Sequence, residues 1–137
     1  MTESTKISFI ARRICEVQDI SDLVKVLVPG NANQQHAAAR ILLVTKANPS
    51  LRSMACLERQ HGISRRTLQR ARAKLARLGL IEYASRLGAR YGGQEGWRLS
   101  SRMSTALRQF ADRIDQWRAD VRADRMAKDE VLADLLR

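Results

Sequence analysis

The chain has 137 residues, which is the size of one compact domain with short appendages. It contains 25 Lys and Arg against 14 Asp and Glu, and this formal net charge of +11 predicts a polyanionic partner. The longest aliphatic run, residues 41–44, is far shorter than the ~20 apolar residues that a membrane span needs. The first 13 residues lack the apolar core of a secretory signal, and two cysteines make no disulfide framework. We therefore expect a cytoplasmic protein without a membrane partner.

The charge is unevenly distributed along the chain. Residues 62–102 carry ten basic and two acidic side chains, whereas residues 103–137 carry seven of each. Five of the seven glycines lie within residues 79–96, so helix is favoured on both sides of that stretch. A solvated surface would spread its charge, and the concentration in the middle of the chain indicates a binding face there.

The N-terminal third of the chain has the apolar spacing of helices. Residues 6–28 show this spacing, and Asp19 or Ser21 could cap a second, separate helix. Residues 29–31 predict a turn. Residues 33–47 predict a helix that ends before Asn48-Pro49. Its expected buried stripe consists of Ala37, Ala38, Ile41, Leu42 and Val44. We expect residues 1–30 to be a helical extension of a domain that covers residues 31–100.

The middle of the chain predicts two short helices followed by a β-hairpin. The helices are expected over residues 53–60 and 64–78, and His61-Gly62-Ile63 forms the turn between them. Ser64 suits the N-cap of the second helix, and Gly79 suits its left-handed C-terminal position. The hairpin strands are expected over residues 80–83 and 96–99, with a glycine-rich tip between them.

The helix over residues 64–78 has an apolar side and an opposite side rich in arginine. No acidic residue occurs between Ser64 and Leu80. Arg66, Gln69 and Arg70 lie on the polar side, at positions where arginine could contact guanine and glutamine could contact adenine in a major groove. Arg65 and Lys74 lie at its margins and are expected to hold phosphates.

The segments LARLGLIEY and GWRLSSRMSTAL resemble the end of the recognition helix and the closing wing strand of winged helix-turn-helix domains. Such domains are found in MarR-like and PadR-like transcriptional regulators, and the similarity covers roughly residues 33–107. It implies a mainly α fold with a small β-hairpin wing, flanked here by additional N- and C-terminal helices. It also implies residues that contact double-stranded DNA. These are Arg65, Arg66, Thr67, Gln69 and Arg70 in the recognition helix and Arg86 and Arg90 at the wing tip.

A transcriptional regulator that binds double-stranded DNA as a homodimer is therefore the predicted function. Two alternatives stay open: a replication, partition or mobile-element factor with the same fold, and a winged-helix module that binds proteins. No paired-carboxylate, nucleophile–base or cofactor motif is present, so we expect neither an enzyme nor a cofactor. Two cysteines and two histidines without CxxC spacing argue against a metal site. The sequence does not identify a small-molecule effector.

Residues 101–137 predict a dimerisation helix with a tail. One long helix is expected to begin near Ser100 or Ser101, and its apolar residues recur with the alternating spacing of a coiled coil. A helix packed on its own domain would need the same stripe, but the balanced charges and two large aromatic residues favour a partner. The apolar stripe starts at Met103. The interface residues predicted on it are Leu107, Phe110, Ile114, Trp117 and Val121.

Overall fold

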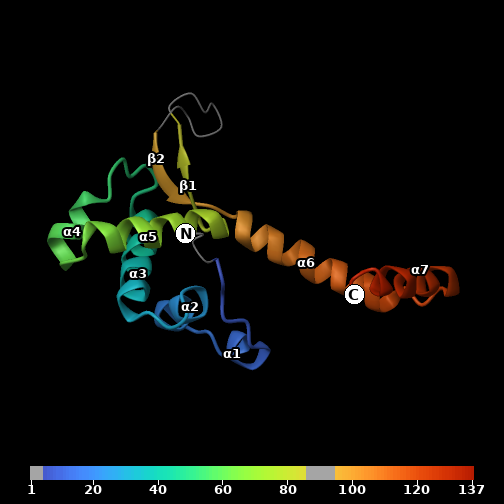
Figure 1. Ribbon diagram of the computed structural model, residues 1–137. Helices are drawn as coiled ribbons and strands as arrows, with labels where there is room; N and C mark the ends of the chain where they lie inside the picture. Colours follow the sequence, from blue (N-terminus) through green and yellow to red (C-terminus); the bar gives the residue numbers. More distant parts are fainter. Residues whose placement is uncertain (1–4, 86–94) are drawn as a thin grey trace. The chain divides into compact units, whose positions relative to one another are not determined.

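The computed structural model describes residues 5–85 and 95–137, and it is mainly helical with a small two-stranded antiparallel hairpin (Figure 1). Two compact units are present, Met1–Arg102 and Met103–Arg137. In chain order, the elements are α1 (Ala11–Cys15), α2 (Ile20–Leu27), α3 (Ala32–Ala47), α4 (Ala55–His61), α5 (Arg65–Leu78), β1 (Ile81–Ala84), β2 (Gly96–Leu99), α6 (Arg102–Ala119) and α7 (Ala123–Asp134).

Side-chain caps determine where three of the helices begin. Asp19, Asn31 and Ser64 each accept a hydrogen bond from the backbone N–H three residues later, at 3.0, 3.1 and 3.2 Å. These bonds satisfy amides that have no partner inside a helix. Of the two candidate caps Asp19 and Ser21, Asp19 is the one observed, and the predicted N-cap Ser64 is confirmed. Gly79 has a φ of +85° and ends α5 in the left-handed conformation, also as predicted.

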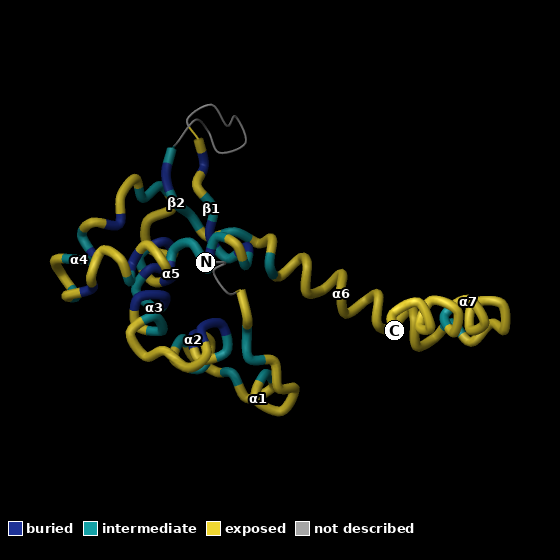
Figure 2. Tube along the Cα trace, in the orientation of Figure 1, coloured by how far each residue is buried: buried dark blue, intermediate teal, exposed yellow. Residues whose placement is uncertain are grey.

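The core of the first unit lies where α3 packs against α5 and the hairpin, and Figure 2 shows the buried residues gathered there. Ile41, Leu75 and Ile81 are fully buried. The predicted stripe of α3 is wrong at one position, because Val44 is half-buried and Thr45 is buried instead. Thr45 follows Ile41 by four residues on the same helix face, and its hydroxyl donates 2.8 Å to the Ile41 carbonyl.

The hairpin pairs β1 with β2 in the register Ile81↔Leu99 to Ala84↔Gly96. The first strand begins and ends one residue later than predicted, because the Leu80 N–H is bonded to the Leu75 carbonyl at 3.0 Å in the turn that ends α5. Leu51 forms an antiparallel bridge with Trp97 on the other edge of β2. Gly96 is required at this edge, since its φ is +147° and an added Cβ would lie 2.6 Å from the Ser50 backbone.

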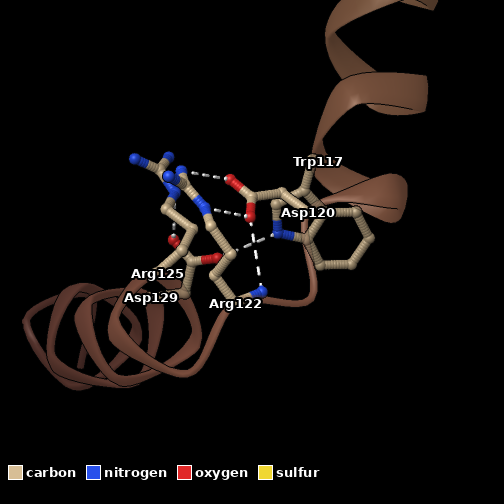
Figure 3. Close-up of polar contacts among 5 residues, drawn as sticks. All are labelled: Trp117, Asp120, Arg122, Arg125 and Asp129. Carbon is tan, nitrogen blue, oxygen red and sulfur yellow. Dashed lines mark hydrogen bonds and ion pairs between the residues drawn. The ribbon is translucent and has the colours of Figure 1, made fainter.

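The prediction of one helix that carries the apolar stripe to Val121 is wrong at its C-terminal end. Helix α6 ends at Ala119, and a short connector precedes the separate helix α7. In the connector, the Asp120 carboxylate accepts hydrogen bonds of 2.9 and 3.0 Å from the Arg122 guanidinium (Figure 3). The hydrogen bond from Arg122 lowers the pKa of Asp120. Val121 therefore lies in the connector rather than on a helix.

Candidate nucleic-acid interface

The turn before α5 fixes the start of the arginine-rich helix. Gly62 ends α4 with a φ of +62°, and Ile63 is buried. The Ser64 hydroxyl accepts the Thr67 backbone N–H and donates to the Thr67 hydroxyl at 2.8 Å. The predicted DNA-binding residue Thr67 is therefore half-buried and already bonded to the N-cap. These contacts hold the first turn of α5 in a defined orientation.

The outward side of α5 is cationic and exposed. Leu68, Ala71 and Leu75 are buried on one side of the helix. On the opposite side, Arg66, Arg70 and Arg77 are exposed and Ala73 is half-buried. No acidic side chain occurs in α5. Two of the predicted base-contacting residues, Arg66 and Arg70, therefore lie together on a surface without a carboxylate of its own helix.

A pocket of about 240 Å³ lies along one flank of α5. It adjoins the loop before α4 and the first turn of that helix. Its polar and charged lining consists of Arg52, Ser53, Glu58, Arg65, Gln69 and Arg72. Three guanidinium groups against one carboxylate make the pocket attractive to an anion. The predicted site residues Arg65 and Gln69 meet here, on the flank of the helix rather than at the centre of its outward side.

A segment near the N-terminus, residues 6–8, lies along the other flank of α5. The Lys74 ammonium donates a 2.7 Å hydrogen bond to the Lys6 carbonyl. Desolvation, and secondly the charge of Arg77, lower the pKa of Lys74. The Ser8 N–H donates to the Val26 carbonyl at 2.8 Å, so the segment is also bonded to α2. Lys74, predicted to hold a phosphate, thus has an internal backbone partner in the structure.

The hairpin carries an aromatic pair next to α5. Tyr83 and Trp97 are cross-strand partners whose ring centroids lie 5.4 Å apart in an edge-to-face arrangement. The Tyr83 hydroxyl donates to Glu95 Oε1 at 2.6 Å. The predicted wing-tip residues Arg86 and Arg90 lie outside the described residues.

Two residues of this surface were not predicted from the sequence, Arg52 and Arg72. Arg72 follows Leu68 by four residues, so it lies at the edge of the apolar side of α5. At such a position the aliphatic part of an arginine side chain can pack against the core while its guanidinium reaches the edge of the pocket. That spacing was a usable signal. Arg52 lies in the segment before α4, and only tertiary structure brings it to α5.

The predicted interface residues of the C-terminal helix are exposed in the single chain. Leu107, Phe110, Ile114 and Trp117 lie on α6, and Val121 lies in the connector. Neither α6 nor α7 has a buried residue.

Comparisons with protein-family models, with curated proteins and with solved structures found no match to this chain. Among residues 5–85 and 95–137, no three metal-ligating side chains gather into a possible metal site. None of the helices described is both long enough and apolar enough to cross a membrane.

Proposed function

We propose that this chain is a winged helix-turn-helix protein that binds double-stranded DNA, with α5 as the recognition helix. The observation that carries the proposal is the exposed, acid-free side of α5, on which Arg66 and Arg70 lie. Guanidinium groups on a rigid helix suit the guanine edge in a major groove. A transcriptional regulator is the role that the sequence resemblance implies.

The flanking pocket supports a separation of base contacts from phosphate contacts within this surface. Arg66 and Arg70 contact base edges, whereas Arg52, Arg65 and Arg72 in the pocket hold a backbone phosphate. Gln69 is exposed and also lines the pocket, so it lies between the two groups and contacts a base next to that phosphate. Phosphate contacts fix the register in which the helix lies on the duplex, and base contacts select the sequence.

The test is duplex binding by the full chain, measured by fluorescence anisotropy across a series of salt concentrations. About four phosphate contacts per protomer predict a log–log salt slope near −3.6 for each protomer bound. The double variant Arg66→Glu/Arg70→Glu should bind far more weakly, because it removes two base contacts and places carboxylates against the duplex.

The matched control is Arg12→Glu/Arg13→Glu, which changes the net charge by the same amount at two exposed arginines of α1. It should keep most of the affinity. A salt slope close to zero for the unmodified chain would refute DNA binding. Equal losses in the two double variants would show that net charge, rather than the surface of α5, determines the affinity.

A further inference from the structure

Exposed apolar side chains are concentrated in the second unit. Six large hydrophobic residues are exposed in the described part of the first unit, against ten in the much shorter second unit. The ten are Leu107, Phe110, Ile114, Trp117, Val121, Met126, Val131, Leu132, Leu135 and Leu136. Helices of this length depend on tertiary packing for most of their stability. The apolar surface of α6 and α7 therefore needs another apolar surface to pack against.

The indole of Trp117 is held in place at the junction of α6 and α7. Its Nε1 donates a 3.2 Å hydrogen bond to Asp129 Oδ2, and Arg125 Nε lies 3.6 Å from the other Asp129 oxygen (Figure 3). The ring is nevertheless 63% exposed. A fixed, exposed aromatic ring is a typical anchor of a protein–protein interface, because little side-chain entropy is lost when it is covered.

Two hollows adjoin this ring. One, of about 600 Å³, has Leu132, Leu135 and Leu136 in its lining, and the other, of about 400 Å³, has Val121 and Met126. Both hollows are open to solvent, and their surface is mainly apolar.

The charges around the hollows define what can enter them. Asp129 and Glu130 line both hollows, and Arg118 and Asp120 also line the smaller one. Helix α7 as a whole carries four acidic and two basic side chains, whereas α6 carries four basic and two acidic ones. The fitting occupant is therefore an apolar helix face with basic flanks. Anionic lipid and nucleic acid fit less well, because α7 carries twice as many acidic as basic side chains.

Helix α6 itself has the required chemistry. Leu107, Phe110 and Ile114 recur at a spacing of three and four residues, which places them on one side of the helix, and Arg108 and Arg113 lie beside them. We propose that the hollows beside Trp117 receive α6 of a second copy of this chain. In a two-fold dimer the contact is reciprocal, so α6 of each protomer packs on α7 of the other and the four helices share one core.

The available area is sufficient for such a dimer. With exposed fractions of 44% to 88%, each of the ten side chains offers on the order of 100 Å², and a stable interface buries about 800 Å² on each partner. The proposal goes beyond DNA binding and is independent of it, because no residue of α5 takes part. It also differs from a coiled-coil seam on α6 alone, since α7 supplies half of the interface.

The test is sedimentation equilibrium of the full chain in the absence of DNA. We expect a dimer at micromolar concentration. Phe110→Asp on α6 and Leu132→Asp on α7 should each raise the dissociation constant at least 100-fold. The matched control is Leu43→Asp on α3, since Leu43 is 44% exposed and Leu132 is 45% exposed. This control should leave the dimer intact.

A charge exchange keeps the test decisive if the aspartate variants lose helix content by circular dichroism. Glu130→Lys/Asp134→Lys makes both helices basic, and Arg108→Glu/Arg113→Glu makes both acidic. Each variant alone should be monomeric, and an equimolar mixture should form a heterodimer. A monomeric unmodified chain, or a mixture that stays monomeric, would overturn the proposal. So would a dimer that survives Leu132→Asp but not Phe110→Asp, because α7 would then have no role.

Failure of this proposal is distinguishable from failure of DNA binding. The α5 variant Arg66→Glu/Arg70→Glu should remain dimeric, and a monomeric Phe110→Asp variant should still bind a duplex through its single recognition helix.

Discussion

The guanidinium carbon of Arg72 lies 5.0 Å from the centroid of the Trp97 ring, and this contact joins α5 to β2. Tyr83 meets the same ring edge to face from β1. Since Arg72 also lines the pocket with Arg65, the hairpin and the flank of α5 share one side chain. A cation over an indole face is attracted by the negative potential of the ring. Arg72 therefore contributes both to the fold and to the charge of the pocket.

Arg72→Met keeps most of the length of the side chain and removes the cation. We expect the free energy of unfolding to fall by about 0.5–1 kcal/mol, the usual contribution of a cation–π contact near the surface. Urea denaturation measures this change. Arg70→Met is the control, because Arg70 is exposed on the outward side of α5, and it should stay within about 0.5 kcal/mol of the unmodified chain. Equal changes in the two variants would contradict a stabilising role for the contact.

Gly96→Ala should be much more destabilising than Gly62→Ala. Both glycines have positive φ, but an added Cβ at Gly96 would lie 2.6 Å from the Ser50 backbone, whereas nothing lies within 4 Å of one at Gly62. We expect a loss of about 1 kcal/mol at Gly62 from backbone strain alone. At Gly96 we expect more than about 3 kcal/mol, because backbone must also move. Similar midpoints of urea denaturation would show that the edge of β2 can shift at little cost.

The features that could be predicted from the sequence are those with a local physical cause. Ser64 could be identified as a cap, and Asp19 as one of two candidates with Ser21, because a short polar side chain can reach the amide three residues on. Gly79 could be identified as the end of α5 because glycine adopts positive φ without a steric penalty. The second strand of the hairpin was predicted with its observed bounds for a similar reason, since a glycine-rich segment precedes it.

The features that could not be predicted depend on contacts between distant or competing groups. The stripe of apolar residues in α6 continues in register to Val121, and neither glycine nor proline occurs near Ala119. Periodicity alone therefore predicts helix through the connector, where the Asp120–Arg122 contact is formed instead. The pocket beside α5 depends on Arg52, and the bond from Lys74 to Lys6 spans 68 residues of chain. No local pattern encodes either of these contacts.

Tyr83 should titrate above its ordinary pKa of about 10. The hydrogen bond to Glu95 is the largest cause, since it stabilises the protonated phenol, and desolvation and the Glu95 charge act in the same direction. Its contribution to stability is therefore present below pH ~10 and is lost as the pH rises through the raised pKa. Absorbance titration in a Tyr91→Phe background isolates this group. Glu95→Gln should lower the midpoint, and an unchanged midpoint would show that the carboxylate does not cause the shift.

Gln69→Ala and Arg65→Ala separate base selection from phosphate binding, because the two side chains line the same pocket but are assigned different partners. Loss of Gln69 should relax the preference at one base position and cost about 1–3 kcal/mol on the best site. Loss of Arg65 should weaken binding to all sequences alike and reduce the salt slope by about one unit. Affinities across a library of duplex sites, measured at two salt concentrations, distinguish the two effects. If both variants changed the sequence preference in the same way, the pocket would read bases and the assignment of its arginines to phosphate would be wrong.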